Sequence, residues 1–337
     1  MNKQIIKRFI IGSVLLVALG KHSNAQQNIQ FTQYMFNSLS VNPAYAGYKE
    51  EWFAQMALRN QWVGIDGAPK TGQVSIDGIV NPDSKTLGVG LQVTSDKLAA
   101  QTTNSVYGNL AYRLRLDAED TQRLSFGIGF GLTQYGIDGN MLEPIDNTDN
   151  SLPLGKIGSF IPDVRVGTYY YNPKWYVGVS LMDLLSGDNS NNLFRWRDGS
   201  SDNIKRKRHL YMITGMLFEF SEQLKFRPSI LVKEEFKGPT TGDFNAMFIF
   251  NDRFWLGGAY RTGMDLWKKD YDENVQLSKA NALGVIAQVY ASERLRIGYS
   301  YDFAVNALQG YQNGSHELTL GLTFGGSSKR LLNPRFF

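Results

Sequence analysis

Strict alternation of large apolar residues with small or polar residues is the sequence feature that most constrains the fold of this chain. Between Arg123 and Thr133, one set is Leu124, Phe126, Ile128, Phe130 and Leu132, and the other is Ser125, Gly127, Gly129, Gly131 and Thr133. A period of two residues places these sets on opposite faces of a β-strand, whereas a helix needs a period of about 3.6. Segments 104–116, 294–304 and 315–325 alternate in the same way. The pattern predicts an all-β protein.

Applied to the whole chain, the pattern predicts fourteen strands. They cover 53–62, 71–80, 86–95, 104–116, 122–135, 161–171, 174–183, 207–220, 224–234, 242–250, 253–262, 281–291, 294–304 and 315–325. The turns after even-numbered strands are short, whereas the odd-numbered strands are followed by longer connections, notably 136–160, 184–206 and 263–280. This arrangement is typical of an outer-membrane barrel whose two ends lie in the periplasm. We therefore predict a 14-stranded antiparallel transmembrane β-barrel. A soluble β-sandwich also alternates, but it gives no reason for two classes of loop length.

The first 25 residues have the composition of a secretory signal. Basic residues at Lys3, Lys7 and Arg8 precede an apolar run that ends near Leu19, and small residues lead to Ala25. The run is too short for a transmembrane helix, although an uncleaved anchor is an alternative. We expect cleavage near Ala25 and location in the outer membrane.

Charge and cysteine content narrow the function classes. The chain has 35 basic and 31 acidic residues, and four of the basic residues but no acidic residue lie before residue 26. The mature protein would therefore be neutral, which removes the support for a nucleic-acid-binding surface. The absence of cysteine excludes disulfides, thiolate metal sites and cysteine nucleophiles.

Aromatic residues gather beside the short turns. They are Tyr171, Trp175, Tyr176, Phe220, Phe226, Phe250, Phe254 and Trp255. Aromatic residues form girdles where a membrane barrel crosses the lipid–water interface. We therefore predict that these eight side chains form the girdle at the short-turn end.

The alternation also predicts the domain organisation. We expect a signal peptide at 1–25, an N-terminal periplasmic or plug segment at 26–52, the barrel at 53–325 and a periplasmic tail at 326–337. In the second segment, Asn42, Pro43, Tyr45 and Gly47 lie in a turn-rich stretch, because proline restricts φ and glycine frees the backbone. This stretch either folds into the lumen as a plug or leads directly into the first strand.

The first hairpin contains a second group of candidate residues. Arg59 and Gln61 share the parity of the predicted lumen face, whereas Trp62, Gly64 and Pro69 would lie at the outer rim. These residues either close the hairpin structurally or contact a partner protein. Arg59 is also a candidate to pair with a carboxylate of the plug.

Short motifs at both ends of the chain carry a family resemblance. They are Gln33-Tyr34-Met35-Phe36-Asn37, Asn42-Pro43-Ala44-Tyr45-Ala46-Gly47, Arg59-Asn60-Gln61-Trp62-Val63-Gly64, Gly67-Ala68-Pro69-Lys70-Thr71 and Asn333-Pro334-Arg335-Phe336-Phe337. They resemble the PorP/SprF family of Bacteroidota outer-membrane proteins. The resemblance implies a part in type IX secretion, in the export or surface attachment of a co-encoded client such as a gliding adhesin. It also implies an OmpA-like peptidoglycan-binding protein as a periplasmic partner.

The sequence favours no enzyme. His209 and His316 are the histidines left after processing, and their parities place them on opposite faces of the sheet, so they would not form a joint site. We interpret His209 as an isolated polar residue at the rim. The segment 146–150 resembles a calcium loop but lacks the turn glycine and the terminal glutamate. We predict no catalytic residue, no cofactor and no metal site.

The long outer loops are the predicted partner-binding region. They carry Phe194, Trp196, Leu266 and Trp267, which would anchor a client domain or, alternatively, cover one another over the barrel mouth. On the first interpretation, the N-terminal segment and the tail remain free for periplasmic partners. The alternative function is a passive channel for hydrophobic or small solutes.

Overall fold

One closed sheet of antiparallel strands makes up the protein. The computed structural model describes residues 29–142, 155–186, 208–236, 240–264, 266, 282–305 and 309–324. The strands are β1 (Trp52–Asn60), β2 (Lys70–Ile79), β3 (Leu87–Leu98), β4 (Gln101–Arg115), β5 (Arg123–Asp138), β6 (Lys156–Tyr171), β7 (Trp175–Met182), β8 (His209–Met216), β9 (Phe218–Glu219), β10 (Leu224–Glu234), β11 (Thr240–Phe250), β12 (Phe254–Met264), β13 (Ala282–Tyr290), β14 (Leu295–Ala304) and β15 (Ser315–Phe324). Four short 3-10 helices complete the fold, namely η1 (Tyr34–Phe36), η2 (Ser38–Ser40), η3 (Pro43–Tyr45) and η4 (Gly139–Met141).

The sheet closes because the first and last strands pair. β1 and β15 run antiparallel from Trp52 opposite Phe324 to Asn60 opposite His316. β8 and β9 both pair with β10 and are separated by Leu217 alone, so they form one strand of a 14-stranded barrel. Closure satisfies the backbone N–H and C=O groups without exposing a sheet edge to lipid. The predicted fold class is confirmed.

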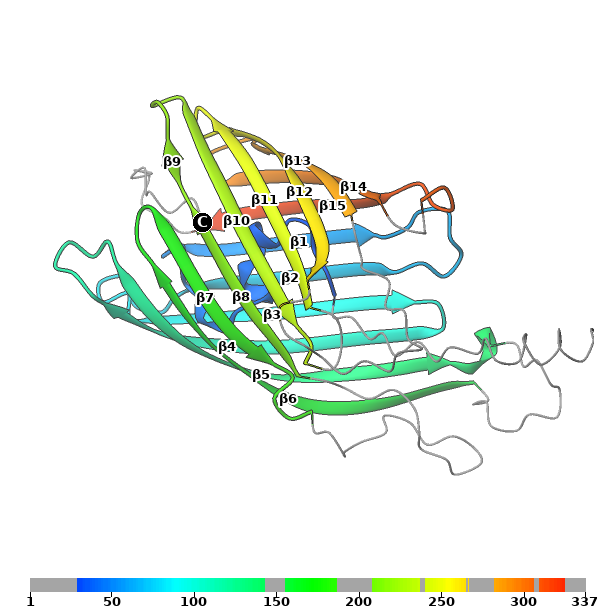
Figure 1. The fold of residues 1–337 in the computed structure, drawn as a ribbon. Coiled ribbons are helices and arrows are strands. Elements are labelled where there is room, and N and C mark those ends of the chain that lie inside the picture. The colour runs from blue at the N-terminus through cyan, green and yellow to red at the C-terminus, as the bar shows by residue number, and fades with distance from the viewer. Residues whose placement is uncertain are drawn as a thin grey trace, which may run out of the picture.

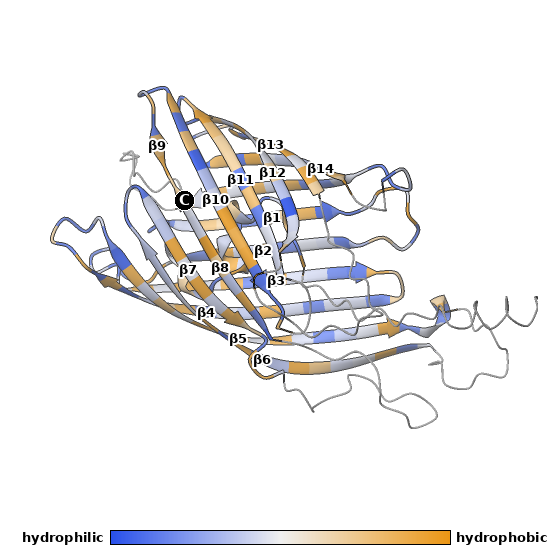
Figure 2. Ribbon diagram, viewed as in Figure 1, coloured by the Kyte–Doolittle hydropathy of each residue, from blue (hydrophilic) through white to orange (hydrophobic). Residues whose placement is uncertain are grey.

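The two faces of the barrel differ as the alternation predicts. Along β4, Val106, Leu110 and Tyr112 are exposed on the outside, whereas Asn109 and Arg113 are buried inside. Figure 2 shows the same change from orange to white or blue along neighbouring positions of the strands. Among the described residues, no helix is long and apolar enough to cross a membrane.

The aromatic girdle contains fewer of the predicted residues than expected. Trp175, Phe220, Phe250 and Phe254 are exposed on the outside, and Phe226 is partly exposed. In contrast, Tyr171, Tyr176 and Trp255 are buried in the lumen, so their assignment to the girdle was wrong. Adjacent residues of a strand face opposite sides, so an aromatic pair such as Trp175 and Tyr176 cannot lie on one face.

The ends of the barrel also differ from each other. Short turns join β4 to β5, β6 to β7 and β11 to β12 at one end, which we call the short-turn end. β5 and β6, β7 and β8, and β12 and β13 follow one another at the opposite end, which we call the long-loop end (Figure 1). Figure 1 also shows the blue N-terminal residues inside the ring of strands. The lumen is therefore the place to look for a functional site.

The outward apolar band allows a direct test of the membrane-facing surface. Replacing Leu110 by Arg should destabilise the barrel by about 2–4 kcal/mol, because the charge would lie in hydrocarbon. Asn104→Arg on the same face of β4, near the long-loop end, should cost about 0–1 kcal/mol. Urea unfolding of the purified protein in lipid vesicles measures both. Equal costs for the two variants would contradict a lipid-facing band.

Candidate functional site

The N-terminal residues 29–50 lie inside the barrel, and we call them the luminal segment. Nearly all residues from Phe31 to Tyr48 are buried, and the segment contains η1, η2 and η3. Asn42 caps η3, since its Oδ1 accepts a hydrogen bond from the Ala44 N–H at 2.9 Å, and Pro43 begins the helix. Proline suits this first helical position because the missing N–H would have no helical partner there.

Glycines in the barrel wall allow the luminal segment to approach closely. A Cβ atom at Gly88 of β3 would lie 2.0 Å from the Ala46 carbonyl oxygen, and one at Gly127 of β5 would lie 2.1 Å from the Ala44 nitrogen. A Cβ atom at Gly167 of β6 would lie 2.2 Å from Asn42 Oδ1. Any larger residue at these three positions would displace the segment. The alternate glycines of β5 thus include one that packs directly against the backbone in the lumen.

Two residues of the Asn-Pro-Ala-Tyr-Ala-Gly motif attach the segment to the wall. The Asn42 side-chain amide donates to the Thr168 carbonyl at 2.8 Å and to the Val179 carbonyl at 3.4 Å. Gly47 adopts a φ of 71° and donates its N–H to Asp77 Oδ2 at 2.9 Å. Glycine suits this position because other residues rarely adopt a positive φ. The motif residues therefore act in positioning the luminal segment.

Arg59 connects the segment to three strands of the wall. Its guanidinium group lies 2.6 Å from Asp302 Oδ2 on β14 and 2.9 Å from Glu317 Oε2 on β15. It also donates to the Thr32 hydroxyl at 2.8 Å. Glu317 accepts the backbone N–H groups of Thr32 at 2.8 Å and Gln33 at 3.0 Å.

Arg59 therefore pairs with carboxylates of the wall and not with a carboxylate of the plug. The reason is compositional, since no acidic residue precedes Glu50 in the luminal segment. Arg59 was among the residues predicted from the sequence, but Asp302 and Glu317 were not. Their parity on β14 and β15 marks them as acids on the lumen face, which is the signal that identifies them.

Aromatic contacts fill the lumen toward the short-turn end. Tyr45 stacks on Tyr48 with ring centroids 4.9 Å apart, and Tyr48 meets Tyr171 edge-on at 4.6 Å. Phe36 meets Trp255 edge-on at 5.3 Å. This explains why Tyr171 and Trp255 face inward: they contact the luminal segment.

The luminal segment ends at a charged cluster beside the short turns. Glu50 lies 2.8 Å from Lys85 Nζ and 3.2 Å from Arg113 Nη2. At its other end, Ile29 lines a pocket together with Lys233 and Asp183, which lie next to the long-loop connections. The segment thus runs down the lumen toward the short-turn end. The expectation that it stays free for periplasmic partners was wrong for these buried residues.

The rim residues of the first hairpin connect two neighbouring loops. The Gln61 N–H donates to the Pro69 carbonyl at 2.9 Å, and the Trp62 N–H donates to Ser315 Oγ at 3.1 Å. Gly64, with a φ of 100°, follows Val63, whose N–H donates to the Gly314 carbonyl. These contacts brace the β1–β2 loop against the loop before β15. Their geometry fits the closure of the hairpin.

The predicted loop anchors are described only in part. Phe194, Trp196 and Trp267 lie outside the described residues, and Leu266 is 47% exposed. His209 and His316 lie on opposite faces, as predicted, because His209 is buried and His316 contacts the outward Tyr299 hydroxyl at 2.6 Å. His209 is not isolated, however, since Asp183 Oδ2 lies 3.2 Å from its Nδ1. Within the described ranges, no three histidine or acidic side chains gather as metal ligands would.

Comparison with known proteins identifies the family. A sequence profile of the type IX secretion system membrane protein PorP/SprF matches residues 23–322. The chain belongs to this family. Its barrel is thus an outer-membrane barrel. In such barrels the short turns generally lie on the periplasmic side and the long loops on the outside. No curated protein sequence matches the chain significantly.

Solved structures resemble this member of the PorP/SprF family in fold. A chain described as the CymD monoaromatic hydrocarbon channel has a TM-score of 0.52 at 11% identity, covering 90% of this chain and 95% of its own. The TodX monoaromatic hydrocarbon channel mutant has a TM-score of 0.48 at 9% identity, with 85% and 93% covered. The Acinetobacter baumannii outer membrane protein Omp33 has a TM-score of 0.45 at 9% identity, with 82% and 98% covered.

The Arg59 contacts predict a large effect on stability. Arg59→Ala would leave Asp302 and Glu317 buried without their cation, which should cost about 3–5 kcal/mol. Arg115→Ala, at an exposed position of β4, should change stability little. Urea unfolding followed by the gel shift between folded and unfolded forms measures both variants. Similar values for the two would mean that the Arg59 contacts do not stabilise the barrel.

Proposed function

We propose that this protein is a type IX secretion barrel that supports the secretion or surface anchoring of a client through protein–protein contacts. Membership in the PorP/SprF family supports a role in that system. The family and the fold are those of a secretion-system membrane barrel and not of an enzyme class. The filled lumen is the observation that carries the proposal, because a passive channel needs a continuous path for its solute.

The luminal segment is the proposed plug. Its residues are held by the ion pairs at Arg59, by the hydrogen bonds of Asn42 and by aromatic contacts down to Tyr171. Buried charge pairs and stacked rings together would resist displacement by a small solute. This argues against a passive solute channel, the competing function. The hydrocarbon channels among the structural relatives share the fold at 11% identity or less, which carries no functional argument.

The partners are proposed on both sides of the membrane. On the outside, the long loops with Phe194, Trp196, Leu266 and Trp267 would hold a secreted client with an adhesin-like C-terminal domain. On the periplasmic side, β15 ends at Phe324, so the tail 326–337 would begin there and meet an OmpA-like peptidoglycan-binding protein. We also propose that the signal peptide is cleaved near Ala25.

Conductance across planar bilayers distinguishes a plugged barrel from a channel. The purified protein should be nearly silent. Gly127→Leu should conduct, because its side chain would take the place of the Ala44 backbone. Gly108→Leu is the matched control and should stay silent, because nothing lies within 4 Å of a Cβ atom at that outward position. Steady conductance by the unaltered protein would favour the passive channel.

The outer-loop anchors allow a test of client capture. Replacing Phe194, Trp196 and Trp267 together by Ala should leave barrel assembly intact and release the client into the medium, because large aromatic anchors dominate such interfaces. Tyr311→Ala, an exposed aromatic in another loop, should leave the client on the cell. Immunoblots of cells and medium measure the distribution. A client that stays cell-bound in the triple variant would place the site elsewhere.

A further inference from the structure

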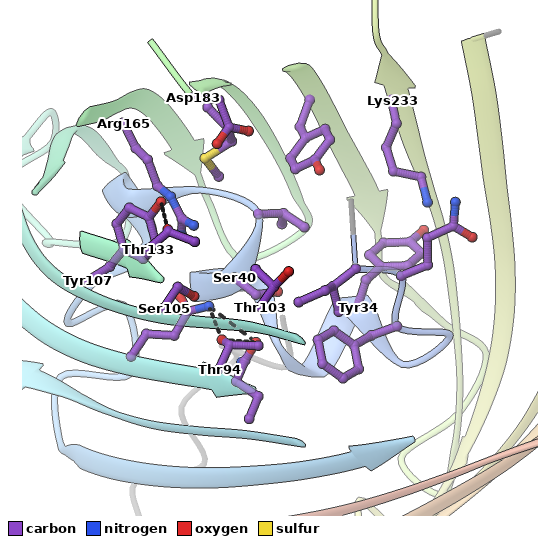
Figure 3. A pocket seen from close by; sticks show the side chains of 18 of the residues that line it. Tyr34, Ser40, Thr94, Thr103, Ser105, Tyr107, Thr133, Arg165, Asp183 and Lys233 are labelled. Atoms are coloured by element: carbon purple, nitrogen blue, oxygen red, sulfur yellow. Dashed lines mark hydrogen bonds between the residues drawn. The ribbon is translucent and has the colours of Figure 1, made fainter. Parts of the chain in front are cut away.

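A pocket lies in the outer half of the lumen, on top of the luminal segment. The segment contributes Ile29, Phe31 and Tyr34, and the wall contributes residues of β2 to β8 and β10. Figure 3 shows Arg165 and Lys233 on opposite sides of this pocket, with Tyr34 and Ser40 between them. The pocket continues the space that the luminal segment fills below, so a second polypeptide segment could enter it from the outside.

Arg165 provides the charge that this pocket presents to a ligand. Its guanidinium group lies 3.2 Å from the centroid of the Tyr107 ring, which fixes its position by a cation–π contact. Within the described part of the chain, Arg165 forms no ion pair, and its Nε has no hydrogen-bond partner. Asp163 lies on the same face of β6, but its Oδ2 accepts the Tyr107 hydroxyl at 3.0 Å.

The other charges at the pocket have partners. Lys233 Nζ lies 2.7 Å from Asp243 Oδ2, and Asp183 lies 3.2 Å from His209. Arg59 and Arg261 also contact carboxylates. Arg165 differs from them because it forms no ion pair with a described residue. An unpaired guanidinium group in a partly buried site favours a carboxylate ligand, which it binds through two parallel hydrogen bonds.

The uncharged lining indicates a peptide as the bearer of that carboxylate. Gln92 is buried, and its Oε1 has no hydrogen-bond partner among the described residues, so it can accept a peptide N–H. Thr103 and Ser105 of β4 add hydroxyl groups that donate to or accept from a peptide backbone. The luminal segment itself demonstrates that this lumen packs polypeptide.

We propose that the outer pocket binds an extended segment of the anchored client, with a carboxylate of that segment on Arg165. The carboxylate belongs to an Asp, a Glu or the C-terminus of the client. This proposal rests on the proposed function, because it names the site where the client is held. Residues 26–28 of this chain, which precede Ile29, carry no carboxylate and would leave Arg165 unpaired.

Site-specific photocrosslinking in cells tests the pocket. A photoreactive amino acid at Ser105, on the lumen face, should give an adduct with a secreted protein, whereas one at Val106, on the lipid face of the same strand, should give none. Mass spectrometry of the adduct should place the crosslink beside an acidic residue or the C-terminus of that protein.

Variants at Arg165 test the chemistry. Arg165→Gln should lower the adduct by about tenfold, because charge-assisted hydrogen bonds are lost, and Arg165→Lys should lower it less. Arg115→Gln, at the exposed short-turn end of β4, should not change it. The adduct is measured relative to the amount of protein that migrates as a folded barrel on gels. A variant that assembles poorly therefore does not affect the comparison.

The outcomes separate the pocket from the function. Three results would overturn the pocket and leave the proposed function standing. The first is an equal amount of adduct in Arg165→Gln and in the unaltered protein, and the second is an adduct with residues 26–28 of this chain. The third is the absence of an adduct while the client stays on the cell. A barrel that retains no secreted protein on the cell would overturn both.

Discussion

The buried contact of Arg59 with Asp302 and Glu317 is the interaction on which the rest of the structure depends. Arg59 and Glu317 are register partners across β1 and β15, the pair of strands that closes the barrel. The same carboxylates receive Thr32 and Gln33 of the luminal segment. One charge cluster thus joins the two ends of the sheet and holds the chain that fills it. Charges in such a site are stable only as a fully paired set, because burial makes each unpaired member costly.

The filled lumen accounts for features that an open barrel would not need. Glycines at 88 and 127 bring the wall within contact of the backbone of the segment, and the glycine at 167 leaves room for the Asn42 side chain. Aromatic residues at 171 and 255 face inward to pack on the segment. A barrel of this size encloses more space than its own inward side chains fill, so a segment of the same chain completes the core. Among the described residues, the pocket around Arg165 lies above this segment, toward the long-loop end.

Prediction from the sequence succeeded where a local rule decides the structure. Alternation places every strand, and each predicted strand has its counterpart in the barrel once β8 and β9 are taken together. The prediction of the aromatic girdle failed where it counted aromatic residues without regard to the face of the strand on which each lies. Tyr176 and Trp255 face the lumen, whereas their neighbours Trp175 and Phe254 lie on the outside. It failed again for the partner of Arg59, because parity indicates which face a side chain occupies but not which residue lies opposite it.

The sequence by itself determined the class of the fold, the two faces of each strand, the order of short and long connections and the turn-rich character of the stretch from Asn42 to Gly47. These follow from the period of two and from the backbone preferences of glycine and proline, which act within a few residues. Only the tertiary structure decided what meets across the closing seam and inside the lumen. Arg59 and Glu317 are 258 residues apart, and their contact exists only because the sheet closes in one particular register. The path of the luminal segment is set in the same way, since its partners come from strands along the whole chain.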